Sequence, residues 1–247
     1  MIAPLAGLIA YNVRIILGSR REFIITPLVI AVVSVTIIPY GLFRYVGTGD
    51  IAVVVSTGLI MGAILLPSMA AALYSVMEVS LGPFEKYMLL PVPRQVVVLA
   101  RIASMALLNM VAVTVALALA AALHGLKITI PVAALAYISS AALTAGITGI
   151  TLLLAGGAAS IERVSLTVSV LGILLADASP MLFPLESLPL WGQALLIINP
   201  VTSSVEVLRR AALEGRLDPV MATALLIVNL GWMAAGMKTL SARLEKL

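Results

Sequence analysis

The chain has 247 residues, of which 62% are hydrophobic and 11% are charged, with 15 Lys and Arg against 11 Asp and Glu. A soluble domain of this length needs far more polar surface, so the composition excludes an ordinary soluble protein. The apolar runs are continuous rather than alternating, which excludes an outer-membrane barrel and predicts an all-α integral membrane protein. The chain has no cysteine, which excludes disulfides and Cys-ligated metals.

The predicted elements begin with residues 1–22, where apolar residues recur at helical spacing and arginines supply a basic side. We expect an N-terminal helix that lies in the membrane interface; the alternative is a frayed start to the first span. Six apolar stretches follow, and each is long enough to span a bilayer core, which takes roughly 20 residues. They are residues 23–43, 51–76, 102–123, 128–159, 164–183 and 220–237. Residues 1–247 are therefore expected to form a single transmembrane domain with six helices.

The basic residues indicate how these spans are oriented. They lie in the connections between apolar runs, so they are interpreted as a topology signal and not as a nucleic-acid surface. With the N-terminus in the cytoplasm, more of them fall on the inner side than on the outer side. The predicted localisation is the plasma membrane, with several passes and with both termini in the cytoplasm.

Residues 78–101 separate the second and third spans. Their charges would each cost roughly 2.5–3.5 kcal/mol in hydrocarbon, so this segment is expected to turn around in the cytoplasm. Gly82 and Pro83 end the incoming helix, and Pro91 and Pro93 end a short helix between them. Such a helix is suited to docking in the groove of a partner. A well-punctuated loop without a partner is the alternative from spacing alone.

Residues 184–219 form the long outer connection. Pro184 and Pro189 bend the chain, and Trp191 is an aromatic residue suited to the membrane interface. The stretch WGQALLIIN can re-enter the outer leaflet as a short helix, and Pro200 turns the chain into a second helix. Irregular backbone at such depth is tolerated only against protein or water, so we expect a gate over the pathway. The alternative is an outer structural cap.

Other candidates carry weaker signals. Asp177 lies in the fifth apolar run and is a possible pathway acid for a cation or a proton, or else an end-of-span residue that reaches water. Gly58 and Gly62 are spaced for close helix packing, as are the glycines of the fourth stretch. Nothing in the sequence resembles a nucleophile with a base, a paired carboxylate site or a phosphate-binding loop. We therefore expect no catalytic, cofactor or metal site in this chain.

Two motifs resemble those of ABC-2 type transporter permeases, and together with the spans the resemblance covers essentially the whole chain. The first is EVSLGPFEKYMLLPVPRQVVVLAR, in which Pro83 replaces the usual threonine. The second is SPMLFPLESLPLWGQALLIINPVTSSVEVLRRAALEG, between the fifth and sixth spans. The resemblance assigns ATPase coupling to Glu78, Gly82, Glu85, Lys86, Leu89, Pro91 and Arg94. It assigns the outer segment, interpreted here as an outer gate, to Pro184, Leu188, Pro189, Trp191, Asn199, Pro200, Thr202, Glu206 and Arg209.

The resemblance implies the membrane subunit of an ATP-driven ABC transporter, most often an exporter. Its cytoplasmic coupling helix would dock on a separate ATPase subunit, which would bind ATP and Mg. A second permease chain, identical or related, would complete the path through the bilayer. Because few charges lie in the spans, an amphipathic or lipid-like cargo is favoured. The alternative function is a self-contained secondary transporter or channel.

Overall fold

The computed structural model describes residues 2–19, 22–46, 50–80, 93–157 and 161–244, and within these ranges the regular elements are helices. The sequence favours them because its long apolar runs are rich in alanine and leucine, which are strong helix formers. The elements in chain order are α1 (Ile2–Ser19), α2 (Glu22–Val46), α3 (Asp50–Ser80), α5 (Arg94–His124), α6 (Ile130–Gly157), α7 (Ile161–Asp177), η1 (Leu185–Ser187), α8 (Leu190–Leu196), α9 (Pro200–Glu214) and α10 (Pro219–Leu244).

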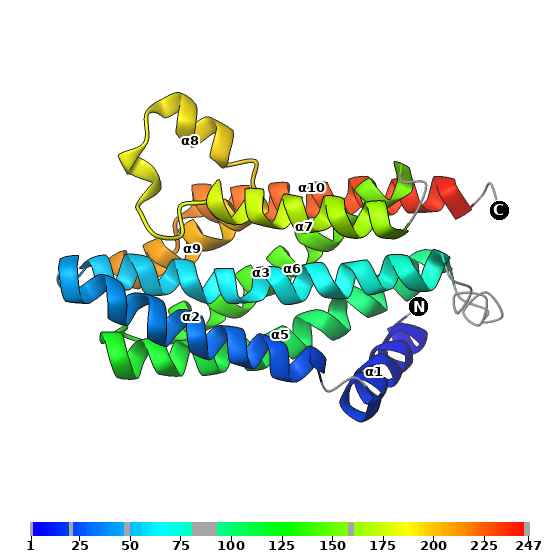
Figure 1. Ribbon diagram of the computed structural model, residues 1–247, viewed down its shortest axis with the longest axis horizontal. Coiled ribbons are helices and arrows are strands. Elements are labelled where there is room, and N and C mark those ends of the chain that lie inside the picture. Colours follow the sequence, from blue (N-terminus) through cyan, green and yellow to red (C-terminus); the bar gives the residue numbers. More distant parts are fainter. Residues whose placement is uncertain (1, 20–21, 47–49, 81–92, 158–160, 245–247) are drawn as a thin grey trace.

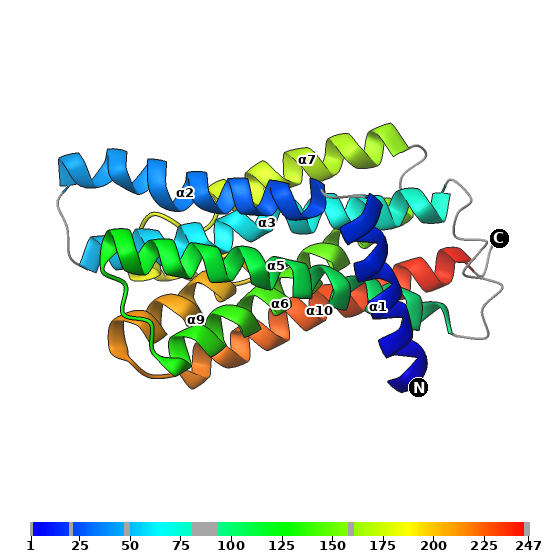
Figure 2. The ribbon, with the colours of Figure 1, turned by 90° about the horizontal axis from the view of Figure 1, so that it is seen from below.

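The long helices α2, α3, α5, α6, α7 and α10 run along the long axis of the molecule (Figure 1). α1 lies across one end of this bundle and packs on α5, and the end of α10 lies at the same end (Figure 2). α8 projects from the opposite end, where α9 packs against α3, α6 and α10. We name these two ends the α1 end and the α9 end.

Four helices are long and apolar enough to cross a membrane: Asp50–Tyr74 in α3, Gln95–His124 in α5, Ile130–Ala155 in α6 and Pro219–Ala242 in α10. They match the second, third, fourth and sixth predicted spans. The first predicted span is α2, whose apolar part, Ile24–Tyr40, is shorter. The fifth is α7, which has 17 residues. For α2 and α7 the assignment as spans stays a prediction.

The fifth predicted span, residues 164–183, is wrong in its last part because α7 ends at Asp177. Pro180 cannot donate a backbone hydrogen bond, and it disfavours the helical conformation of Ser179. The chain turns here, and the N–H of Met181 donates to the carbonyl oxygen of Ser179 at 2.8 Å. Residues 178–184 therefore form an irregular connection at the α9 end.

Large apolar side chains cover the outside of the bundle. Ile37 on α2, Leu166 on α7 and Ile227 on α10 are 64%, 69% and 67% exposed. A soluble monomer rarely exposes apolar surface on this scale, whereas hydrocarbon accommodates it without cost. The surface therefore agrees with a multi-pass membrane protein.

Glycines let the helices approach closely inside the bundle. A Cβ built on Gly149 of α6 would lie 2.3 Å from the carbonyl oxygen of Trp232, and one on Gly236 of α10 would lie 2.1 Å from that of Gly149. Backbone contact of this kind is possible only without side chains. Gly149 and Gly236 therefore serve the interface of α6 with α10 within one chain.

Candidate functional site

The helix α9 organises the α9 end of the bundle. Asn199 caps it, because its side-chain oxygen accepts a hydrogen bond from the N–H of Val201 at 2.9 Å. Pro200 occupies the first turn, where its fixed φ and missing N–H suit a helix start. Residues 200–209 are all buried, although several of them are polar or charged. The sequence thus places a polar helix inside an apolar bundle.

Asn199 also joins α9 to the end of α7. Its Nδ2 donates to the carbonyl oxygens of Leu175 at 2.9 Å and Ala178 at 3.0 Å. Carbonyls in the last turn of a helix have no partner within that helix, so a side chain must supply one. One asparagine therefore begins α9 and ends α7.

Arg209 is the most highly connected side chain of this region, and it is 2% exposed. Its Nη1 donates to the carbonyl oxygen of Phe183 at 2.9 Å and to Oε1 of Glu206 at 2.5 Å. Its Nη2 donates to the carbonyl oxygens of Val54, Pro180 and Met181. Buried charge is tolerated when it is paired and hydrogen-bonded in this way. The guanidinium therefore fixes residues 180–183 between α3 and α9.

Glu206 is the acidic partner in this pair and is fully buried. α9 lies outside the four candidate spans, and burial raises the pKa of the Glu206 carboxyl, which Arg209 lowers in part. Burial likewise lowers the pKa of Arg209. Oε2 of Glu206 has no hydrogen-bond partner among the described residues and lies 3.9 Å from Nε of Arg210.

Arg210 extends the charges toward the surface. It pairs with Oε1 of Glu186 at 2.6 Å and with Oδ2 of Asp218. The other carboxylate oxygen of Asp218 accepts from the N–H groups of Val220 and Met221 and so caps α10. Although burial acts in the other direction, these N–H groups and Arg210 hold the pKa of Asp218 below its ordinary value. Arg210 thus ties η1 and the start of α10 to α9.

Sequence reasoning missed the role of Arg210, which it counted only among the basic residues on the outer side, and it assigned no role to Asp218. A signal was present for Asp218. Asp218-Pro219 repeats the arrangement of Asn199-Pro200, a capping residue followed by proline at a helix start. For Arg210 no local pattern names its partners, since Glu186 is 24 residues away.

Gly58 fixes the irregular connection from the other side. A Cβ on Gly58 would lie 1.9 Å from the carbonyl oxygen of Met181, and one on Gly62 would lie 3.0 Å from Sδ of Met181. The predicted glycine pair of the second span therefore packs closely against this connection, within the same chain.

The remaining predicted gate residues lie apart from this buried network. Pro184 and Pro189 precede η1 and α8, and Leu188 lies between these elements. Trp191 on α8 is 75% exposed and its neighbour Leu190 is 82% exposed. The structure brings Asn199, Pro200, Thr202, Glu206 and Arg209 together on α9, and it leaves the other four gate residues on the projecting segment.

Asp177 is the last residue of α7 and is exposed. It lines a cavity of about 270 Å³ at the α9 end, together with apolar side chains such as Ile38 and Leu59. Its two predicted roles, a pathway acid and an end-of-span residue that reaches water, stay predictions. Among the described residues no group of three His, Cys, Asp or Glu side chains could hold a metal ion.

Two of the seven predicted coupling residues lie in the described helices, and the other five do not. Gly82, Glu85, Lys86, Leu89 and Pro91 lie outside the described residues. Glu78 is in the last turns of α3 and Arg94 is the first residue of α5, so the flanks of this segment are placed at the α1 end (Figure 1).

Comparison with known proteins identifies the family. No curated protein matches the chain. The family model of the ABC-2 type transporter matches residues 8–213, which is most of the chain and includes all of residues 78–101 and most of residues 184–219. The chain therefore belongs to the ABC-2 type transporter family and is a permease subunit of an ABC transporter.

Proposed function

We propose that this permease subunit works in an ATP-driven exporter. Two permease chains, identical or related, form the path between them, and separate ATPase subunits bind and hydrolyse ATP with Mg. The observation that carries the proposal is the family match over residues 8–213, because it spans both motifs on which the resemblance depends.

In this proposal the α1 end faces the cytoplasm. The ends of α3, α6 and α10 and the starts of α5 and α7 lie at that end with α1 (Figure 2). An ATPase that binds residues 78–101 would therefore act on α3 and α5 directly. Glu85 and Lys86 supply the charges for docking, and the prolines transmit displacement to both helices.

The outer segment divides into a fixed part and a movable part in this proposal. Arg209 and Asn199 hold α9 against α3 and α7. α8 projects from the bundle with an exposed tryptophan, and it is the element free to open and close over the pathway.

The test is co-expression with the products of the genes that neighbour the permease gene, followed by purification and reconstitution in liposomes. We expect the ATPase to co-purify and Glu85→Arg to uncouple ATP hydrolysis from transport. Glu214→Arg is the matched control, because it makes the same charge change on an exposed residue at the opposite end. Wild-type transport by Glu85→Arg would contradict the coupling role. Ion flux through the purified chain without nucleotide would instead favour a secondary transporter or channel.

A further inference from the structure

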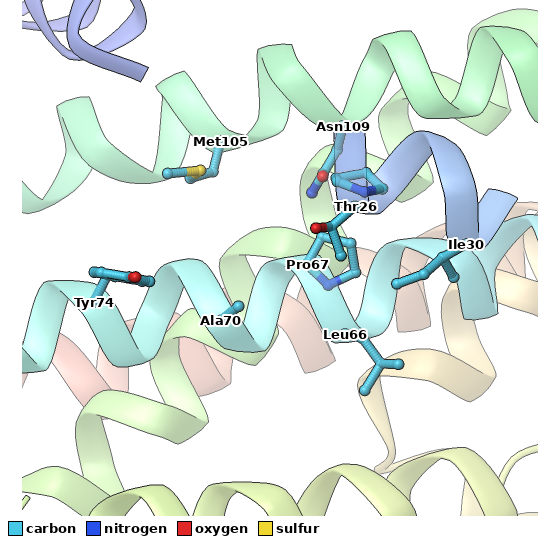
Figure 3. Close-up of a pocket in the computed structure, with 9 residues that line it drawn as sticks. Thr26, Ile30, Leu66, Pro67, Ala70, Tyr74, Met105 and Asn109 are labelled. Atoms are coloured by element: carbon cyan, nitrogen blue, oxygen red, sulfur yellow. The ribbon is translucent and has the colours of Figure 1, made fainter. Parts of the chain in front are cut away.

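A cavity of about 330 Å³ lies between α2, α3 and α5 (Figure 3). Thr26 near the start of α2 and Tyr74 near the end of α3 place it in the half of the bundle toward the α1 end. Its volume is at the lower end of the range of ligand-binding cavities in proteins. It is far from the residues of α8 and α9 described above, so it is a separate candidate site.

Prolines in both helices make room for this cavity. Pro27 lies inside α2 and Pro67 inside α3, and both line the cavity as buried residues. A proline inside a helix removes one backbone hydrogen bond and bends the helix. Both prolines therefore lie where α2 and α3 border the cavity.

The mouth and the floor of the cavity differ. Leu66 is 55% exposed and Ala70, one turn further along α3, is also exposed, so these residues form a mouth on the outside of the bundle. Met105 and Asn109 of α5 are buried at the floor. Because α3 and α5 are both candidate spans, this mouth faces the hydrocarbon of the membrane.

The side-chain amide of Asn109, at the floor of the cavity, has a hydrogen-bond acceptor that no described residue uses. Nδ2 of Asn109 donates to Oγ of Ser68 at 3.1 Å and to Oγ1 of Thr144 at 2.9 Å. The hydroxyl proton of Thr144 goes to the carbonyl oxygen of Ser140, so Thr144 must accept from Asn109. This fixes the orientation of the amide. Its oxygen accepts no hydrogen bond among the described residues, and in Figure 3 the amide lies beside Thr26.

The lining determines what such a cavity accepts. None of the nine lining residues carries a charge, and a charged ligand would be left unpaired in an apolar site. A saturated chain without a polar group would fill the space but would leave the amide oxygen of Asn109 without a donor. The fitting ligand is neutral, largely apolar and equipped with one hydrogen-bond donor.

We propose that this cavity binds a neutral, largely apolar molecule from the membrane, with a hydroxyl that donates to the amide oxygen of Asn109. A long-chain alcohol represents this class. The site belongs to a single chain, so the proposal does not depend on the ATPase, on export or on a second permease chain.

The test uses a long-chain fatty alcohol that carries a photoreactive diazirine on its chain, with the purified chain in lipid nanodiscs. After illumination, mass spectrometry locates the labelled residues. We expect labelling to concentrate on residues 66–74 and 105–109 and to be displaced by unlabelled alcohol. The methyl ether of that alcohol keeps the chain but lacks the donor, so we expect it to compete about two- to tenfold more weakly.

Two variants test the location. Ala70→Trp places a large ring in the mouth and should lower labelling at least severalfold, and Leu66→Trp repeats the test if the first variant does not fold. Ala118→Trp is the matched control, because Ala118 is also exposed on α5 but does not line the cavity. Undiminished labelling in the folded mouth variants, or labelling spread evenly over the apolar surface, would overturn the site. Equal competition by the alcohol and its ether would overturn the role of Asn109.

Discussion

The helices α8 and α9 belong to the same family motif and lie at the same end of the bundle, yet their surroundings are opposite. Residues 200–209 of α9 are buried, including the charges of Glu206 and Arg209. α8 is largely apolar, but Leu190, Trp191 and Leu195 are 82%, 75% and 66% exposed. Polar residues lie inside and apolar residues outside, which reverses the arrangement of a soluble protein.

This difference separates structural roles from contact roles within one motif. The polar groups of α9 donate hydrogen bonds to backbone carbonyls of α3, α7 and residues 180–183, so they hold the α9 end together. We call this hydrogen-bonded part of the structure the frame. The apolar groups of α8 contribute little to that frame. Because these side chains make few contacts within the chain, they can contact lipid, cargo or a second chain.

Replacement of Arg209 by methionine is expected to have the largest effect on the frame. Arg209→Met leaves the buried Glu206 without its hydrogen-bonded partner, with only the more distant Arg210 nearby, and removes the donors to Val54, Pro180 and Phe183. We expect a loss of about 3–5 kcal/mol in the free energy of unfolding. Unfolding by heat or denaturant of the protein in detergent would measure it.

The double variant Arg209→Met with Glu206→Met sharpens this result. It removes both charges, so no buried charge is left unpaired, and we expect it to be more stable than Arg209→Met alone. Equal losses in the single and double variants would show that the carbonyl contacts, and not the ion pair, account for the role of Arg209.

Gly58→Ala is expected to have the next largest effect. The added Cβ would lie 1.9 Å from the backbone oxygen of Met181, so the connection from α7 must move away from α3. We expect a loss of about 1–3 kcal/mol by the same unfolding measurement. Gly231→Ala on α10 is the matched control, because nothing lies within 4 Å of its built Cβ and the better helix former should gain up to about 1 kcal/mol. A loss in both variants would show a general intolerance of alanine.

Asn199→Ala should cost about 1–2 kcal/mol, because it removes the cap of α9 and both donors to the end of α7. Asn199→Ser separates these functions, since serine also caps helices but is too short to reach α7. We expect hydrogen exchange to rise at the last turn of α7 in both variants, and at the first turn of α9 in the alanine variant alone. Unchanged exchange at α7 would contradict the joint role of Asn199.

Much of the architecture could be predicted from the sequence because hydrophobicity fixes where long helices lie. The second, third, fourth and sixth predicted spans coincide with helices that can cross a membrane. Helix-breaking prolines also predicted helix boundaries correctly at Pro189 and Pro200, where α8 and α9 begin. The same proline signal was overlooked at Ser179-Pro180, where the apolar run continues past the end of α7.

The site was less predictable because its contacts join distant segments. The motif marked Arg209, but its partners at Val54 and Phe183 are 155 and 26 residues away. The close contact between Met181 and Gly58 could not be predicted from the sequence either, because a glycine pair indicates close packing but does not identify the segment that packs there. Burial of α9 was also unexpected from its composition, because its polar residues indicate a water-facing helix until their partners are known.

Trp191→Ala is expected to have the smallest effect on the frame, and it tests the other half of the comparison. The side chain is 75% exposed, so its loss should change the free energy of unfolding by no more than about 0.5 kcal/mol. If α8 is the movable part of the gate, ATP-dependent transport in reconstituted liposomes should nevertheless fall severalfold. Asn199→Ser supplies the contrast, since it changes stability through a buried residue of the same motif. A loss of stability in Trp191→Ala as large as that of Asn199→Ala would place α8 in the frame, because an exposed ring contributes to folding only when it packs against the rest of the chain.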